Sequence, residues 1–408
     1  MTPSNTLRKF VTGTGAAAFL AGGFAFAGDN GKAIIDDKMP IEGSWSICDI
    51  FDYSTLYEGE SGFIKEIALT GRYHGQHISQ QEDVGGVTSN GFHQWQTRRA
   101  RLGLDIEFSN GVSFFSSLNV SDGDGTSGAF TRDRFFNDFD EVGIEWETDL
   151  FAITVGRQKQ KITREFSTSS KRIKTIERSH IVNEVSGQKA WGVTVGFETG
   201  EIKHAIGSWV TGHDGDWNLP RFESRGALSY QVEVPLSDAT DFHFDYVFTN
   251  NSGGTVNGRG NAPDGNDAPY GHVFAIGTES EWGRLGLVTD LILGFDREGQ
   301  GASGGSNAIP AGNDTWGFVV MPTYEITEKL EAVVKFSYMD EGRNQRTQRY
   351  PSRQNVENYS TIYAGLNYYI CKDKLKVMGG YEHATGELFG TGTDVDSGTW
   401  MVSLRTYF

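Results

Sequence analysis

The chain has 408 residues, of which 53 are glycine, 9 are proline and 12% are aromatic. This composition suits strands and turns, and it excludes a collagen-like chain because no G-x-y period is present. The formal net charge is −17, which argues against nucleic acid as a partner because phosphate backbones are bound by basic surfaces.

The N-terminus has the pattern of a signal peptide. Arg8 and Lys9 form a short positive region, and an apolar run of small residues follows over 16–26. Ala25-Phe26-Ala27 matches the small-x-small cleavage pattern, so we predict that residues 1–27 are removed during export. The alternative, a transmembrane helix, would need a longer apolar run. Without this leader the chain has 34 basic and 53 acidic residues, a net charge of −19.

The remaining sequence is too polar for a bundle of transmembrane helices. Its mean hydropathy is −0.41, and no later segment has 18 consecutive apolar residues. A transmembrane β-barrel escapes this objection, because only alternate residues face lipid and the others face water. We therefore look for period-two alternation between turn signals.

Alternation is clear over 94–108, where Ala100, Leu102 and Leu104 lie on one face and Arg99 and Arg101 on the other. We predict sixteen strands, at residues 63–73, 94–108, 111–120, 138–147, 150–157, 188–198, 201–211, 222–234, 240–249, 270–281, 284–295, 314–325, 329–339, 357–371, 374–384 and 398–408. Short turns alternate with connections of about ten to thirty residues, as expected of a barrel with tight turns at one end and long loops at the other. The last strand ends in an aromatic residue, Phe408, as in bacterial outer-membrane proteins.

These patterns predict an all-β fold, a transmembrane antiparallel β-barrel of sixteen strands over residues 63–408. A soluble β-sandwich or propeller would not segregate short and long connections in this way. Sixteen strands leave an aqueous channel rather than a core filled with side chains. We expect the chain to reside in the cell outer membrane, in contact with its lipid and lipopolysaccharide.

The third long connection, 158–187, is the longest and has an unusual charge. Eight basic residues lie between Arg157 and His180, opposed only by Glu165 and Glu177. If this loop folds inward, it surrounds the passage with cations, as in anion and phosphate pores. The alternative is a solvated loop that binds lipopolysaccharide or acidic neighbours. The candidate anion-binding residues, which include two on the polar face of the second strand, are Arg99, Arg101, Arg157, Lys159, Lys161, Arg164, Lys171, Arg172, Lys174 and Arg178.

Three segments resemble the phosphate-selective porin O/P family. They are TRRARLGLDIEF at 97–108, VGRQKQKITREFSTSSKRIKTIERS at 155–179 and LYEGESGFIKEIALTGRYHGQ at 56–76, the last similar to members from planctomycete and verrucomicrobial bacteria. The resemblance implies a homotrimeric channel whose third loop folds inward as a basic constriction for phosphate, polyphosphate or related anions. It places the loop residues from Lys159 to Arg178 near that constriction.

Other chemistry has little support. The sequence lacks G-x-S-x-G and H-E-x-x-H, so we predict no enzyme, no cofactor and no metal site. His74 and His77 form a pair in a predicted exposed loop, without further ligands. Within transport, the alternative to an anion porin is a general or cation-tolerant one. From another class, the barrel could anchor envelope layers.

The only two cysteines, Cys48 and Cys371, both fall on the predicted periplasmic side, in an oxidising compartment. We therefore hypothesise a disulfide that ties residues 28–62, a periplasmic N-terminal segment, to the barrel rim. The alternative is two separate buried thiols.

Overall fold

The computed structural model describes residues 31–33, 46–59, 62–88, 91–120, 138–186, 189–210, 226–250, 270–297, 314–343 and 355–408. The predicted signal peptide and parts of most of the long connections lie outside these residues. No helix in the described part of the chain is long and apolar enough to cross a membrane.

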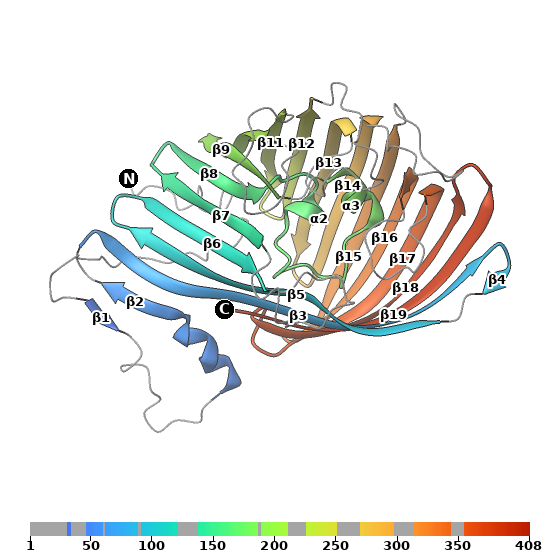
Figure 1. The fold of residues 1–408 in the computed structure, drawn as a ribbon, viewed down its shortest axis with the longest axis horizontal. Coiled ribbons are helices and arrows are strands. Elements are labelled where there is room, and N and C mark those ends of the chain that lie inside the picture. The colour runs from blue at the N-terminus through green and yellow to red at the C-terminus, as the bar shows by residue number, and fades with distance from the viewer. Residues whose placement is uncertain are drawn as a thin grey trace.

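The chain forms a closed antiparallel β-barrel of 16 strands, which confirms the predicted fold (Figure 1). Each strand pairs with the next along the chain, and the barrel closes where β19 pairs with β3. The barrel strands are β3 (Ile64–Val84), β5 (Phe92–Phe108), β6 (Val112–Asn119), β7 (Asp138–Glu147), β8 (Phe151–Lys159), β9 (Lys189–Thr199), β10 (Ile202–Val210), β11 (Gly226–Ser237), β12 (Thr240–Thr249), β13 (Tyr270–Trp282), β14 (Leu285–Arg297), β15 (Thr315–Thr327), β16 (Leu330–Arg343), β17 (Asn355–Tyr369), β18 (Leu375–Leu388) and β19 (Thr393–Tyr407).

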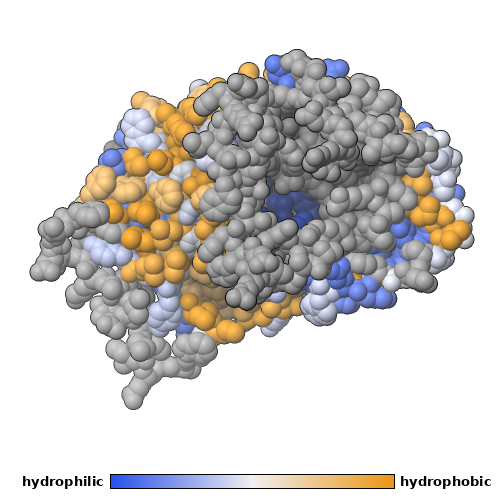
Figure 2. Space-filling model, viewed as in Figure 1, coloured by the Kyte–Doolittle hydropathy of each residue, from blue (hydrophilic) through white to orange (hydrophobic). Residues whose placement is uncertain are grey.

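The strands separate apolar from polar side chains by simple alternation. On β16, Phe336 is exposed on the outside, whereas its neighbours Lys335 and Ser337 are buried inside the barrel. Outward-facing apolar side chains recur around the barrel, and Figure 2 shows many of them as orange patches on the outer surface. In this arrangement the backbone N–H and C=O groups of each strand are hydrogen-bonded within the sheet, and apolar side chains face the lipid.

One barrel end carries the short turns, and we call it the short-turn end. Gly200 and Gly283 adopt positive φ angles of 66° and 62° there, a conformation that tight hairpins need and that glycine adopts without strain. Exposed aromatic side chains gather near this end on several strands, among them Trp146, Trp282 and Tyr324. Such aromatic residues are typical of the membrane interface.

The first strand is longer than predicted. We expected it to end at Tyr73 and a loop to follow, but β3 continues to Val84, and a short strand, β4 (Val87–Thr88), pairs with its end before β5 begins. Beyond Tyr73 both faces of β3 are largely polar, so no apolar stripe marks the extension. His74 and His77 therefore lie on a strand rather than in an exposed loop, and His74 is fully buried.

The N-terminal segment continues the sheet at the short-turn end, with β1 (Gly31–Ala33), a 3₁₀ helix, η2 (Ile47–Ser54), and β2 (Thr55–Gly59). β19 ends opposite Arg72 of β3. β2 pairs with the earlier part of β3, from Glu66 to Ala68, which β19 does not reach. The open edge of β3 is thereby covered, which prevents edge-to-edge association. Figure 1 shows β1 and β2 beside the start of β3, outside the barrel.

A disulfide joins Cys48 in η2 to Cys371 in the turn between β17 and β18, with Cα atoms 5.4 Å apart. η2 is capped by Ser46, whose side chain accepts the N–H of Cys48. Phe51 is the buried residue of η2, and the ammonium group of Lys374 lies 5.8 Å from the centre of its ring. The disulfide therefore holds η2 against the barrel rim.

Replacing both cysteines with serine is expected to release η2 and β2 while leaving the barrel intact. The remaining links include three residue pairs between β2 and β3, the Thr55–Glu66 hydrogen bond and the contact of Lys374 with the Phe51 ring, and a native disulfide contributes about 2–5 kcal/mol. Limited proteolysis with mass spectrometry should show faster cleavage within residues 46–62, by on the order of tenfold or more. Unchanged cleavage in the Cys48→Ser/Cys371→Ser protein would contradict a tethering role.

Candidate functional site

The segment between β8 and β9, residues 160–188, contains two short helices, α2 (Arg164–Ser167) and α3 (His180–Val185). Thr163 precedes α2, and its hydroxyl accepts the N–H of Phe166 at 3.1 Å. Figure 1 shows α2 and α3 within the ring of strands. We call the described part of this segment, 160–186, the lumen loop.

Buried apolar side chains hold the lumen loop to one side of the barrel. Ile162, Phe166, Ile181, Val182 and Val185 belong to one cluster. Their partners in that cluster include Val273, Ile292, Val319 and Met339, on β13 to β16. Because apolar contact inside a polar lumen removes surface from water, this cluster determines which part of the wall the loop covers.

Polar contacts join the lumen loop to the wall at several strands. Lys335 on β16 donates to Glu165 at 2.9 Å, to the hydroxyl of Thr175 at 3.2 Å and to the carbonyl of Glu177 at 2.8 Å. Both side chains of the Lys335–Glu165 ion pair are almost completely buried. Asp290 on β14 accepts the N–H groups of Arg164 and Glu165 at 3.1 and 3.3 Å.

Three of the predicted anion-binding residues are buried. Lys159 donates to the carbonyls of Phe166 and Thr168, the second at 3.2 Å. Arg178 donates to the carbonyls of Glu165 and Thr168, at 3.0 and 2.8 Å. Arg157 is also buried, on β8. Lys159 and Arg178 therefore maintain the shape of the loop.

Three other predicted residues form ion pairs with the wall. Arg101 lies 2.6 Å from Asp140 on β7, and Lys174 lies 2.7 Å from Glu331 on β16. Arg164 pairs with two carboxylates, Glu233 on β11 at 3.2 Å and Glu279 on β13. Part of the loop's positive charge is thus neutralised by the acidic wall, which sequence composition could not indicate.

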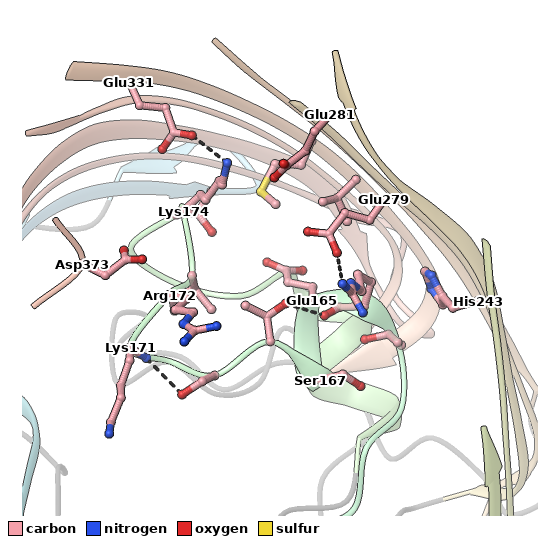
Figure 3. A pocket seen from close by; sticks show the side chains of 18 of the residues that line it. Glu165, Ser167, Lys171, Arg172, Lys174, His243, Glu279, Glu281, Glu331 and Asp373 are labelled. Atoms are coloured by element: carbon pink, nitrogen blue, oxygen red, sulfur yellow. Dashed lines mark hydrogen bonds and ion pairs between the residues drawn. The ribbon is translucent and has the colours of Figure 1, made fainter. Parts of the chain in front are cut away.

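The remaining loop candidates, Lys161, Lys171 and Arg172, line a cavity of about 610 Å³ between the loop and the wall. Figure 3 shows Lys171, Arg172 and Lys174 on the loop side and the carboxylates of Glu279, Glu281, Glu331 and Asp373 around them. Arg172 is exposed, and the ammonium of Lys171 lies 4.9 Å from the centre of the Tyr407 ring. Neither Lys171 nor Arg172 forms an ion pair with another described residue.

A second basic region lies where β3, β5 and β19 meet the loop. Arg72 and Arg101 stand directly opposite each other on β3 and β5, and Arg405 lies opposite His74 on the other side of β3. Like charges in directly opposed positions repel. We call the following residues the arginine cluster: Arg72, Arg98, Arg99, Arg101, Arg178 and Arg405.

The alternation of apolar and polar residues in the sequence did not identify Arg98 and Arg405 as lumen residues. It also did not establish that Arg72 points inward. The pairing of β3 with β5 shifts register between His74 and Gly75, so that Arg98 has no opposite residue. A β-bulge of this kind re-aims side chains, and Arg98 points inward with Arg99, bonding Glu177 at 2.9 Å. Arg405 could have been identified from the sequence, because it is a basic residue on the polar face of the last strand.

Only two carboxylates form ion pairs with the arginine cluster among the described residues, Glu177 with Arg98 and Asp140 with Arg101. Arg72 bonds the hydroxyl of Ser170, and Arg405 the carbonyl of Ile176. Burial and the nearby charges of Arg98 and Arg101 lower the pKa of Arg178 to about 10, so it stays charged at neutral pH. The cluster therefore has an excess of positive charge.

A closed barrel with an apolar outer surface and a charged lumen is typical of an outer-membrane channel of the porin class. Residues 67–235 match the family model "Phosphate-selective porin O and P". This match confirms the resemblance that the sequence motifs indicated. Among the described residues, no group of three or more His, Cys, Asp and Glu side chains could hold a metal ion.

Three solved structures have the same fold. The channel DcaP of Acinetobacter baumannii matches with a TM-score of 0.56 and 13% identity, over 84% of this chain and 97% of that one. OmpF of Salmonella typhi, in complex with daunomycin, matches with a TM-score of 0.53 and 14% identity, over 83% and 97% of the two chains. OmpT of Vibrio cholerae gives 0.50 and 12%, over 84% and 98%. A search of curated protein sequences finds no significant match.

Proposed function

We propose that the protein is a passive porin that prefers anions, with phosphate or polyphosphate among its solutes. The observation that carries this proposal is the arginine cluster, six guanidinium groups with two carboxylate partners among the described residues. Guanidinium groups donate pairs of parallel hydrogen bonds that match the oxygens of phosphate. The phosphate name of the matching family supports the same solute.

The acidic cavity favours a second candidate, a general or cation-tolerant porin. Glu233, Glu279 and Glu331 each pair with a basic residue, but Glu281 and Glu325 also line this cavity without an ion pair to any described residue. A cation could follow this wall while anions follow the arginine cluster. Anchoring of envelope layers has no comparable support among the described residues.

Measurements of ionic current across planar bilayers decide between these two candidates. Under a potassium chloride gradient, the reversal potential of an anion-preferring channel has the sign set by chloride. Added inorganic phosphate should reduce the chloride current, because a tightly held anion leaves the pore slowly. A reversal potential set by potassium would reject the proposal in favour of the cation-tolerant porin.

We further propose that residues 1–27 are a signal peptide, that residues 28–62 lie in the periplasm and that the channel is a homotrimer. The first rests on Arg8, Lys9 and the Ala25-Phe26-Ala27 site, and the last on the family resemblance. N-terminal sequencing of exported protein should begin at Gly28. Chemical cross-linking in outer membranes should yield a trimer. Recovery of monomers alone would contradict the homotrimer.

The anion preference should weaken at alkaline pH through Lys171. Burial and the neighbouring charge of Arg72 lower the pKa of Lys171 to about 8, so this side chain loses its positive charge as the pH rises through that value. Between pH 7 and 9 the ratio of chloride to potassium permeability should fall about twofold to fivefold, since one charge at about 4 Å contributes about 1 kcal/mol in water. The Lys171→Met channel should have the lower ratio at both pH values, and an equal pH response in both proteins would contradict the assignment.

A further inference from the structure

The cavity between the lumen loop and the wall has opposite charges on its two sides. Lys171 and Arg172 lie on the loop side, where neither forms an ion pair with a described residue. Glu281 of β13 and Glu325 of β15 lie on the wall side, and their carboxylates also have no ion-pair partner in the described part of the chain. The cavity volume of about 610 Å³ is within the range of about 300–1,000 Å³ that is typical of small-molecule sites.

The register of the wall places the two carboxylates on either side of a glycine. Glu281 lies opposite Gly286 on β14, and Glu325 lies two residues beyond the partner of Gly286 on β15, so it shares the inward face of that partner. The ammonium of Lys174 lies beside Gly286 and bonds Glu331 at 2.7 Å. This position therefore accommodates an ammonium group, and Glu281 and Glu325 leave the wall with an excess of negative charge.

The cavity also has apolar surface. Val288 and Met321 are opposite each other on β14 and β15, further along the same inward faces, and both line the cavity. Ile173 of the lumen loop lines it as well and is buried. A methylene chain that covers such side chains is removed from water, which is favourable for each CH₂ group.

Arg172 is the group that can hold an anionic end of a solute. Its side chain hydrogen-bonds that of Tyr407, which occupies part of the five N–H donors of a guanidinium. Figure 3 shows Arg172 on the loop side of the cavity, with the carboxylate of Glu281 on the wall. The other donors of Arg172 match the two oxygens of a carboxylate, and Lys171 adds a second positive charge on this side.

We propose that this cavity binds small zwitterions, namely aliphatic amino acids whose ammonium and carboxylate are separated by a methylene chain. The ammonium lies against Glu281 and Glu325, the carboxylate lies against Arg172, and the chain covers the apolar surface between them. A simple anion is attracted by the loop side but repelled by the wall, and a simple cation the reverse. This inference goes beyond the proposed anion preference and does not depend on it, because a zwitterion has no net charge.

The test is the reduction of potassium chloride current through the full-length channel in planar bilayers by three probes of similar length. The probes are δ-aminovalerate, valerate and pentylammonium. δ-Aminovalerate should halve the current at a concentration about tenfold lower than either other probe, since each charge contact contributes about a factor of five in water. Glu281→Gln/Glu325→Gln should raise that concentration about tenfold without weakening the effect of valerate. Glu201→Gln is the matched control, because Glu201 is exposed in the turn between β9 and β10.

Arg172→Gln tests the other side of the cavity and should weaken the effects of δ-aminovalerate and valerate about fivefold each. Equal effects of the three probes on the native channel overturn the site, and so does pentylammonium acting as strongly as δ-aminovalerate. A native response to δ-aminovalerate in a conducting variant of either side also overturns it. The reversal potential of the same channels separates the two proposals. Anion selectivity without a preference for δ-aminovalerate rejects only the zwitterion site, whereas cation selectivity with that preference rejects only the proposed function.

Discussion

Lys335→Met is expected to detach the lumen loop from the wall without opening the barrel. In the native protein Lys335 makes three hydrogen bonds to the loop, and its charge compensates that of Glu165. Methionine has a similar length but no charge, so the buried carboxylate keeps only the N–H of Ser179, at 3.1 Å. Removing one partner of a buried ion pair typically costs about 3–5 kcal/mol. The strand pairs of β16 do not depend on this side chain.

This cost should appear as a larger population of the open loop, by about a hundredfold to several thousandfold, since each 1.4 kcal/mol is a factor of ten. Trypsin should then cleave within residues 159–178 much faster, and single-channel currents should become larger and noisier. The double variant Lys335→Met/Glu165→Gln removes both charges and should recover much of the docking. If Lys335→Met leaves both the cleavage rate and the current unchanged, the ion pair does not hold the loop.

The strand pattern was predictable because membrane strands must alternate where lipid meets water. On β5 the contrast between Leu102 and Arg101 is visible in the sequence alone. Where the barrel wall extends past the lipid, as in β3 beyond Tyr73, both faces are largely polar and the contrast disappears. For that reason the extension of β3 to Val84 could not be predicted from the sequence, and His74 was assigned to a loop.

The candidate site was predictable in composition but not in arrangement. The excess of basic residues over 157–178 was evident, but the partners of these residues come from distant strands. Glu165 and Lys335 are 170 residues apart in the chain, and no local pattern relates them. The bulge at Arg98 depends on the register of two strands, which alternation assumes to be regular. Sequence therefore indicates the presence of charge, whereas long-range pairing determines which charges remain available.

Replacing Arg98 and Arg99 together with glutamine is expected to change the selectivity of the channel more than any single loop substitution. These neighbours supply two positive charges beside one carboxylate, Glu177, which Arg98 now neutralises. Without them the arginine cluster keeps four guanidinium groups beside the carboxylates of Glu177 and Asp140, so its excess of positive charge falls by two. Two charges at about 4 Å contribute about 2 kcal/mol in water, enough to lower the ratio of chloride to potassium permeability by about tenfold or more.

Reversal potentials of Arg98→Gln/Arg99→Gln and of the native channel, measured under one potassium chloride gradient, test this expectation. Arg284→Gln is the matched control, because Arg284 is an exposed arginine of the short turn between β13 and β14. It should leave the permeability ratio close to the native value. If the double variant folds and keeps the native ratio, the arginine cluster does not set selectivity, and the cations of the lumen loop at Lys171 and Arg172 become the groups to replace next. The loop anchors at Lys335 and Asp290 lie on other strands and remain in place in the double variant. A lower permeability ratio at unchanged conductance would therefore indicate an effect of charge rather than of pore width.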